Sequence, residues 1–253
     1  MKIAIVTGAS SGMGEEFCRH LDRKGLDEIW LIARRADRLK NISETLSTHC
    51  RIIPADLTQT NSFDHIRKEL KSSDPDVRYL VNCAGFGKFG NTWEIPDSET
   101  RGMIDLNITA LVEMTNLCIP HMSDGSRVIQ LCSASAYISL YKLNVYASTK
   151  AFVRSFCNGL RKEVEYKGIT VTEVSPGWVD TDFITISKET DEVPDKVFKH
   201  LLRKEDVVAK AMIDADRGKD RSVTGTFYRI QIAMSTHFPR LAANVWRGYF
   251  GHR

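Results

Sequence analysis

A tyrosine and a lysine four residues apart are the side chains best suited to proton transfer in this sequence. They are Tyr146 and Lys150, in the segment Tyr-Ala-Ser-Thr-Lys. If the segment is helical, both lie on one face with Cβ atoms about 5–6 Å apart. A neighbouring ammonium favours the phenolate and lowers a tyrosine pKa from about 10 towards working pH. Such a tyrosine can take a proton from an alcohol or return one to a carbonyl oxygen.

The interpretation of this pair depends on its surroundings, because such a pair is more often exposed and without function. A predicted strand over residues 127–132 ends at Ser133, and Ser135 follows two residues later. The carboxyl ends of strands in open α/β sheets are where ligands bind. Both serines are therefore candidates for a hydrogen bond to a bound molecule.

The elements that must position these residues are an alternation of short apolar runs and longer amphipathic stretches. Several runs are continuously apolar, as in parallel strands that are covered on both faces. The pattern predicts a Rossmann-type, doubly wound, mostly parallel seven-stranded sheet with helices on both faces, in one domain over residues 1–253. The predicted strands are residues 3–6, 29–33, 51–55, 79–82, 127–132, 170–175 and, least clearly, 225–232. The predicted helices are residues 13–24, 35–48, 62–71, 98–117, 145–166 and 204–215.

A glycine-rich turn, Thr7-Gly8-Ala9-Ser10-Ser11-Gly12-Met13-Gly14, follows the first strand and precedes a helix. Glycines permit a tight turn and a close approach of the backbone to a pyrophosphate, and the helix start offers free N–H groups. Glycine spacing alone is weak, but this position at the head of a repeated strand–helix pattern makes it specific. We expect a dinucleotide to bind at Gly8, Ser10, Ser11, Gly12, Met13 and Gly14.

The end of the second strand indicates which dinucleotide fits. An NAD site usually places an acid there for the ribose 2′-hydroxyl, whereas an NADP site supplies arginine for the 2′-phosphate. This chain reads Ala33-Arg34-Arg35 and has no carboxylate at that point. A guanidinium can bind a phosphate with two hydrogen bonds, so Arg34 and Arg35 predict NADP(H). The alternative is a solvated arginine pair at a helix start.

Composition excludes several classes of protein. The 253 residues are 42% hydrophobic and 26% charged, as in soluble globular proteins, and a net charge of +3 does not suggest nucleic acid. Six cysteines form no CxxC pair or Cys/His cluster, so we expect no metal site and a reducing compartment. The first predicted strand starts at residue 2 and no run of 18 apolar residues occurs, so we expect a cytoplasmic protein without a spanning helix or membrane association.

Several motifs in one order resemble those of the short-chain dehydrogenase/reductase family, in its single-domain type. The resemblance covers residues 1 to about 182 and includes the glycine-rich turn and the Tyr–Lys pair. It also includes Asn82-Cys83-Ala84-Gly85, Asn107 on the long middle helix, and Pro176-Gly177-Trp178-Val179-Asp180-Thr181. The resemblance implies hydride transfer between NADP(H) and a carbonyl compound or secondary alcohol, since the arginine tip is similar to that of NADP-preferring members.

The resemblance also implies catalytic roles. Ser133, thirteen residues before the tyrosine, would hydrogen-bond the reacting oxygen in preference to Ser135. Tyr146 would donate or accept the proton, and Lys150 would lower its pKa and hold the nicotinamide ribose. Asn107 would position a water that relays protons to Lys150; the alternative is a structural asparagine inside a helix.

Further nucleotide contacts follow from the same resemblance. Asp56 and Leu57 would meet the adenine, although Asp56 could also be a loop or helix-capping acid. Asn82, Ala84 and Gly85 would lie beside the adenine ribose. The nicotinamide carboxamide would be held by the stretch that includes Pro176, Gly177, Val179 and Thr181.

The substrate side is expected to be bulky and apolar, with a lid over about residues 181–215. A bulky apolar ketone or a hydroxysteroid-like molecule would suit it. Candidate wall residues, each equally explicable as core or dimer contacts, are Phe183, Ile184, Val197, Phe198, Leu201, Gly87, Phe89, Trp93, Tyr137 and Tyr141.

The C-terminal extension, about residues 230–253, departs from the family by its length and basic character. Packing on the same subunit, a subunit contact and a membrane-surface segment are the three interpretations, and Pro239 with few basic residues disfavours the last. We expect a homodimer or homotetramer.

Two rival functions remain. A catalytically silent nucleotide-binding scaffold would be indicated by loss of the tyrosine or lysine, and both are present. A nucleotide-sugar epimerase or dehydratase would need more chain for a sugar-binding region.

Overall fold

Seven parallel strands form one sheet in the order β3-β2-β1-β4-β5-β6-β7, within the residues that the computed structural model describes, 1–251. The doubly wound sheet and its strand number are as predicted, and all of the pairings are parallel. The strands are β1 (Lys2–Thr7), β2 (Glu28–Ala33), β3 (His49–Pro54), β4 (Asp76–Asn82), β5 (Arg127–Leu131), β6 (Thr170–Val174) and β7 (Arg221–Ser222).

Helices cover both faces of this sheet, and the strand residues alternate between the two cores. Ile3 and Ile5 of β1 pack into one core, while Ala4 and Val6 pack into the other. Successive side chains of a strand point to opposite faces, so a strand covered on both sides must be apolar throughout. One face carries α3 (Thr60–Ser73), α5 (Ala110–Cys118) and α6 (Asn144–Val164), and the other carries α1 (Gly12–Leu21), α2 (Ala36–Ser43) and α8 (Lys204–Asp216).

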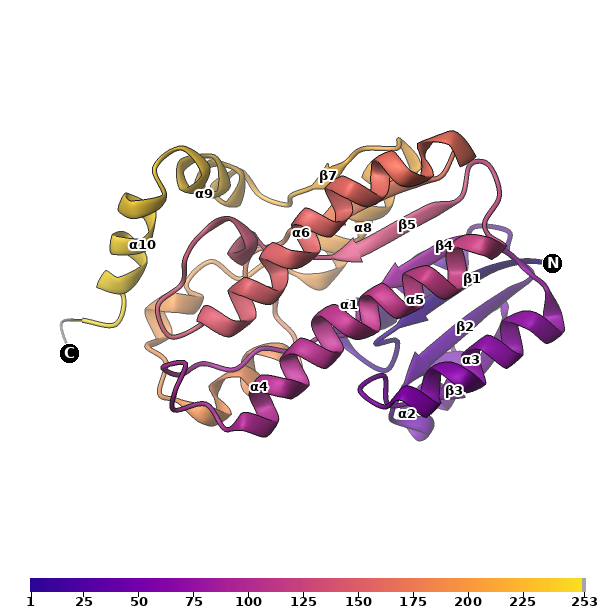
Figure 1. Cartoon of the computed structure of the whole chain (residues 1–253), viewed down its shortest axis with the longest axis horizontal. Coiled ribbons are helices and arrows are strands. Elements are labelled where there is room, and N and C mark those ends of the chain that lie inside the picture. The colour runs from indigo at the N-terminus through magenta and orange to yellow at the C-terminus, as the bar shows by residue number, and fades with distance from the viewer. Residues whose placement is uncertain (252–253) are drawn as a thin grey trace.

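The chain order reverses beside β1, which pairs with β2 on one side and β4 on the other. A reversal of this kind leaves a crevice at the carboxyl ends of the strands, where ligands bind. In Figure 1 the arrows of β4 and β5 point towards the end of the molecule that carries α4 (Asp97–Ile104), α9 (Thr226–His237) and α10 (Pro239–Gly248). The functional residues are therefore to be found between the sheet and these helices.

The helix predicted over residues 98–117 is interrupted by a π-helical turn. Residues Asp105–Thr109 form this turn between α4 and α5, and Asn107 is buried at its centre. Single π turns within α-helices commonly occur at functional sites. The π-helical turn places Asn107 beside α6, which contacts the turn.

The strand predicted over residues 225–232 is wrong. The last strand is the two-residue β7, which pairs Arg221 with Glu173 and Ser222 with Val174. Residues 226–237 form α9, because Tyr228, Ile232 and Ser235 recur at helical spacing and are all buried. Gly225, with φ of +84°, lets the chain turn between strand and helix.

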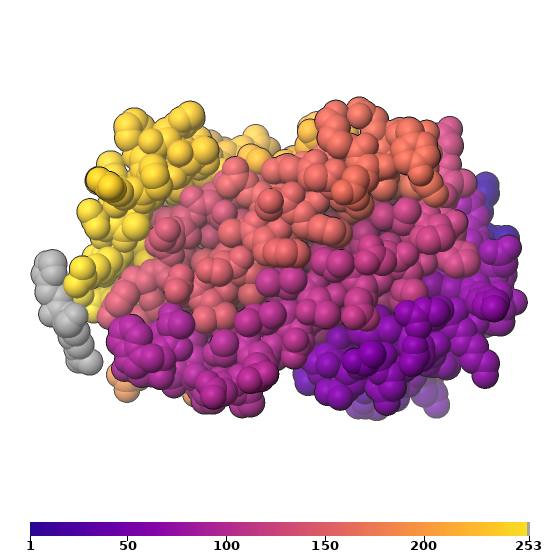
Figure 2. Space-filling model, viewed as in Figure 1, coloured from indigo at the N-terminus to yellow at the C-terminus, as the bar shows by residue number. Residues whose placement is uncertain are grey.

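The C-terminal segment packs on its own chain as far as the described residues extend. Trp246 of α10 is 6% exposed, and its indole N–H donates to the carbonyl of Tyr141 at 2.8 Å. Tyr249 and Phe250 join it in a third apolar cluster. Figure 2 shows this segment, in yellow, forming one end of the molecule. Of the predicted extension, His252 and Arg253 lie outside the described residues.

We predict that Trp246→Ala lowers the free energy of unfolding by about 3–5 kcal/mol, because it removes a large buried side chain. Leu241→Ala on the same helix, where the side chain is 55% exposed, should change it by no more than about 0.5 kcal/mol. Urea denaturation of both variants measures the difference. Equal effects would contradict the packing of α10 on the sheet domain.

Candidate active site

One cavity of about 540 Å³ runs along the carboxyl ends of the strands. The glycine-rich turn lines one end, and Ser133, Tyr146 and Lys150 line the other. Most of the predicted site residues meet in it. They are Gly8, Ser10, Ser11, Gly12, Met13, Gly14, Arg34, Arg35, Asp56, Leu57, Ala84, Gly85, Ser133, Tyr146, Lys150, Pro176, Gly177, Val179 and Thr181.

The glycines of the turn are required by close backbone contacts. A Cβ on Gly14 would lie 2.1 Å from the carbonyl oxygen of Gly8, and one on Gly8 would lie 2.9 Å from the backbone of Ala84. The turn thus packs between the start of α1 and the end of β4. The first N–H groups of α1, which begins at Gly12, are left for an anionic group. These contacts suit a dinucleotide pyrophosphate.

Arg34 and Arg35, which follow β2, line the same end of the cavity as the glycine-rich turn. Arg35 donates from Nη2 to the hydroxyls of Ser10 and Ser11, at 3.1 and 3.0 Å. Arg34 is exposed and lines the cavity beside it. Asp56 also lines the cavity, but its carboxylate accepts from the backbone N–H and the hydroxyl of Thr58, at 3.0 and 2.8 Å. Two guanidinium groups therefore face a position where a phosphate could bind.

Asn82 is one predicted nucleotide residue that the structure does not bring to the cavity. Its side chain is buried and donates to the hydroxyl of Thr115 on α5 at 3.1 Å. Thr7 takes the neighbouring role, because its hydroxyl accepts from the backbone N–H groups of Cys83 and Ala84 at 3.1 and 3.2 Å. Asn82 thus joins the end of β4 to α5, and Thr7 joins the residues that follow β4 to β1.

Tyr146 and Lys150 lie on one face of α6, as their spacing predicts. The Lys150 ammonium is 5.8 Å from the centre of the Tyr146 ring and donates to the carbonyl of Leu131 at 2.8 Å. Burial raises the pKa of Tyr146 well above 10, and a hydrogen bond with Ser133 lowers it in part. Burial also lowers the pKa of Lys150. In the chain alone burial has the larger effect and raises the pKa of Tyr146, and the expected lowering by Lys150 stays a prediction.

The position of the Tyr146 ring depends on Gly87. A Cβ on Gly87 would lie 2.7 Å from the ring, so only glycine leaves room for it. Phe183 packs on the ring with centroids 5.3 Å apart. Gly87 therefore positions Tyr146, although it does not line the cavity as predicted.

Ser133 is the serine that serves Tyr146, as the spacing indicates. It precedes a 3-10 turn, Ala134–Tyr137, and its hydroxyl accepts from the backbone N–H of Ser135 at 3.1 Å. The Ser135 hydroxyl is buried and has no hydrogen-bond partner among residues 1–251. Both serines border the cavity, and Ser133 is the one that lowers the pKa of Tyr146.

Asn107 is fully buried and its amide is occupied on both sides. It accepts from the backbone N–H of Phe86 at 3.0 Å, and donates to the Phe86 carbonyl at 2.9 Å and the Thr149 hydroxyl at 3.0 Å. A Cβ on Gly85 would lie 2.8 Å from the Asn107 oxygen and 3.5 Å from the Lys150 nitrogen. Asn107 thus ties the segment after β4 to α6 beside Lys150, without lining the cavity itself.

Gly177 lies against an aromatic ring that leaves no room for a side chain. The ring of Tyr228 covers it so closely that a Cβ would overlap the ring at 1.8 Å. The Tyr228 hydroxyl accepts from the backbone N–H of Trp178 at 3.2 Å and donates to the carbonyl of His200. Helix α9, unpredicted from sequence, therefore supports the stretch from Pro176 to Thr181.

The substrate end of the cavity differs from the prediction. Of the ten candidate wall residues, only Phe183 lines it. Val197, Phe198, Phe89, Tyr141 and Ile184 belong instead to the cluster under α10, and Trp93 is 81% and Leu201 46% exposed. The observed apolar lining consists of Phe86, Leu106, Ile138, Leu140, Leu143, Phe183 and Ile186.

A charged group at this end was missed from sequence. Lys88 has a side chain only 4% exposed, and it pairs with Glu189 and, at 3.7 Å, with Glu99. All three border the cavity. They come from three separate segments, so no local spacing could have indicated them.

Other expected features concern metals, thiols and membrane helices. Within residues 1–251 the cysteines are free thiols, and no group of three or more His, Cys, Asp or Glu is arranged to hold a metal. None of the helices in that part of the chain has the length and apolar character needed to span a bilayer.

Comparison with known proteins agrees with this geometry. A family model described as short chain dehydrogenase matches residues 2–192. An uncharacterised oxidoreductase of Staphylococcus epidermidis is 31% identical over 182 residues, which span 71% of this chain and 79% of that protein. Very-long-chain 3-oxoacyl-CoA reductase-A of Danio rerio is 32% identical over 203 residues, spanning 76% of this chain and 63% of that protein. The chain belongs to the short-chain dehydrogenase family, and it is an oxidoreductase by that membership.

Solved structures share its fold. A short-chain dehydrogenase from Sphingobium yanoikuyae in complex with NADPH is 21% identical with a TM-score of 0.80, covering 96% of each chain. One from Burkholderia phymatum in complex with NAD is 18% identical with a TM-score of 0.83, covering 95% of this chain and 94% of that one. The fold thus accommodates either nicotinamide cofactor.

We predict that Gly14→Ala weakens dinucleotide binding by at least about 100-fold, because the new Cβ would displace the carbonyl of Gly8. Gly159→Ala, on α6 with open space around it, is the control and should leave binding unchanged. Titration of NADPH fluorescence measures both. Unaltered binding to the Gly14 variant would place the pyrophosphate elsewhere.

Proposed function

We propose that this protein is an NADP(H)-dependent oxidoreductase that interconverts a carbonyl compound and a secondary alcohol. The observation that carries the proposal is one continuous cavity with the glycine-rich turn at one end and Ser133, Tyr146 and Lys150 at the other. When bound, the nicotinamide supplies or accepts the hydride. The chain's own residues bind the cofactor and substrate, and they manage the proton and the charge at oxygen.

Each residue has a defined task in this reaction. In reduction, Tyr146 gives its phenolic proton to the carbonyl oxygen as that oxygen becomes negative, and in oxidation it takes the proton back. Ser133 donates a hydrogen bond to the same oxygen and orients it. Lys150 supplies positive charge near the phenol and holds the nicotinamide ribose. Asn107, through the segment after β4, supports a water path from Lys150 to solvent.

The cavity lining supports a bulky, largely apolar ketone or a hydroxysteroid-like alcohol as substrate. Phe86, Ile138, Leu140, Leu143 and Phe183 provide apolar surface around Tyr146. Burial of apolar substrate surface there is favourable. The charged group at Lys88 adds one polar point within this wall.

Cofactor preference, location and assembly belong to the same proposal. Arg34 and Arg35 at the end of β2, with no carboxylate beside them, support NADP(H). Buried free thiols in the described residues support the cytoplasm. Exposed apolar side chains such as Phe152, 40% exposed on α6, support a homodimer or homotetramer.

We predict that Tyr146→Phe lowers kcat by at least about 100-fold, because it removes only the proton-transferring hydroxyl. Tyr166→Phe, in the 3-10 turn Glu165–Lys167 that follows α6, changes a side chain that is 82% exposed and should retain full activity. NADPH oxidation across a panel of ketones, aldehydes and steroids measures both. Full turnover by the Tyr146 variant would refute its role.

We predict that Arg34→Asp reduces the preference for NADPH over NADH by about 10-fold to 100-fold, because it replaces a phosphate-binding cation with a repelling anion. Arg23→Asp makes the same change of charge at an exposed position away from the cavity and should leave the preference intact. The ratio of kcat/KM for the two cofactors is the measurement. A wild-type enzyme that uses NADH as well as NADPH would overturn this assignment.

A further inference from the structure

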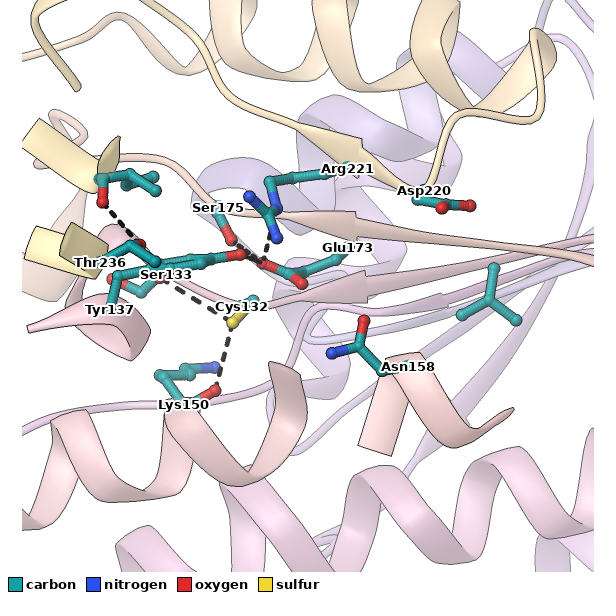
Figure 3. Close-up of polar contacts among 12 residues, drawn as sticks. Cys132, Ser133, Tyr137, Lys150, Asn158, Glu173, Ser175, Asp220, Arg221 and Thr236 are labelled. Atoms are coloured by element: carbon teal, nitrogen blue, oxygen red, sulfur yellow. Dashed lines mark hydrogen bonds and ion pairs between the residues drawn. The ribbon is translucent and has the colours of Figure 1, made fainter. Parts of the chain in front are cut away.

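A buried carboxylate lies behind the turn that carries Ser133. Glu173, in β6, is fully buried, and one of its oxygens accepts from the hydroxyls of Tyr137 and Ser175, each at 2.5 Å. Arg221 of β7 approaches the same oxygen at 3.8 Å. Figure 3 shows these three side chains converging on Glu173. The second carboxylate oxygen has no hydrogen-bond partner among residues 1–251, so this group is costly to bury and calls for a role.

Tyr137 connects this carboxylate to Ser133. It is the last residue of the 3-10 turn Ala134–Tyr137, which begins directly after Ser133. Within the turn, the backbone N–H of Ala136 donates to the carbonyl of Ser133 at 3.0 Å. Short 3-10 turns have poor hydrogen-bond geometry, so tertiary contacts must hold them. Burial, and then the Glu173 carboxylate, raise the pKa of Tyr137, which keeps its hydroxyl protonated as a donor.

The Tyr137 ring also contacts the catalytic helix. The guanidinium of Arg154 lies 4.2 Å from the ring centre, and that of Arg221 lies 4.7 Å from it. Arg154 is four residues after Lys150 and eight after Tyr146, so all three occupy one side of α6. Arginine over an aromatic ring is attracted by its electron-rich face, more strongly where water is excluded. One phenol therefore joins the serine turn to β6, β7 and α6.

Within the described residues, neither Tyr137 nor Glu173 lines the cavity, whereas Ser133 and Ser135 do. Direct contact with substrate or cofactor is therefore not their task. We propose that Tyr137 and Glu173 are positioning residues, which hold the Ser133 hydroxyl at a fixed distance from Tyr146 by joining the serine turn to β6 and α6. This inference rests on the proposed function of Ser133 and Tyr146.

The first test is Tyr137→Phe, which keeps the ring and removes the hydroxyl. We expect kcat to fall by about 10-fold to 100-fold, because small displacements of catalytic groups are costly, while KM and NADPH affinity stay within about twofold. The midpoint of the pH profile for alcohol oxidation should rise, because Ser133 lowers the Tyr146 pKa. The titratable groups near Tyr146 are Lys150 on α6 and Cys132 after β5, and the variant retains both.

Tyr79→Phe is the matched control. Tyr79 is a phenol as buried as Tyr137, and it donates to the carboxylate of Asp216 at 3.0 Å. Burial raises its pKa to about 12, so it too is a protonated donor. We expect a comparable loss of thermal stability with kcat and its pH midpoint unchanged. If Tyr137→Phe behaves like this control, the inference is overturned.

Variants of Glu173 separate length from charge without altering Tyr137. Glu173→Gln keeps an acceptor oxygen within reach of the Tyr137 hydroxyl and should retain kcat close to that of the wild type. Glu173→Asp keeps the charge but withdraws the oxygen by one methylene, and should lower kcat and raise the pH midpoint. The opposite order would show that the charge, not the hydrogen bond, matters, and would contradict the inference. This pair decides the question even if Tyr137→Phe does not fold.

A double-mutant cycle with Ser133→Ala distinguishes failure of the inference about Tyr137 from failure of the proposed function. If Tyr137 acts through Ser133, Tyr137→Phe should have little further effect on kcat in the Ser133→Ala protein. Losses that multiply would show an independent effect and overturn the inference. Full turnover by Ser133→Ala alone would instead refute the proposed function, whatever the Tyr137 variant does.

Discussion

Burial of Tyr146 is the constraint on which the rest of the site depends. The phenol is enclosed by Gly87, Phe183 and the serine turn, and this burial disfavours its ionised form. The same burial disfavours the charged form of Lys150. If the phenol exchanges protons as proposed, its negative charge must be offset by groups at short range. Ser133 does so by a hydrogen bond, and in the proposed mechanism Lys150, 5.8 Å from the ring centre, does so by attraction.

The fold meets this requirement by bringing three segments to one point. The end of β5 presents Ser133, α6 presents Tyr146 and Lys150, and the π-helical turn brings Asn107 against α6. Asn107 is held from outside the cavity by its hydrogen bond to Thr149, and we infer that Tyr137, bonded to Glu173, supports the turn after Ser133 in the same way. The apolar wall around them supports the proposed substrate, which offers little charge of its own.

Local patterns made much of this predictable, and long-range contacts account for what was missed. The helix that pairs Tyr146 with Lys150 and the glycine-rich turn are determined within a few residues, so spacing was sufficient. Residues 225–232 were misassigned because a run of apolar residues near a glycine fits either a strand or a helix, and only packing against the sheet decides. The inward direction of Asn82 and the meeting of Lys88 with Glu99 and Glu189 depend on register and tertiary contact, which no single segment specifies. Phe89, Tyr141 and Phe198, which were expected to line the cavity, pack in the apolar cluster with Trp246 of α10 instead.

The most direct test of the account is the pH dependence of kcat for alcohol oxidation in the wild type, Lys150→Arg and Lys150→Met. If positive charge at position 150 offsets the burial of the phenol, Lys150→Met should raise the midpoint by at least about one unit, whereas Lys150→Arg should keep it closer to that of the wild type. The rate would then be lost at low pH, where the phenol stays protonated, and recovered as the pH rises. A midpoint that is the same in all three proteins would contradict the account.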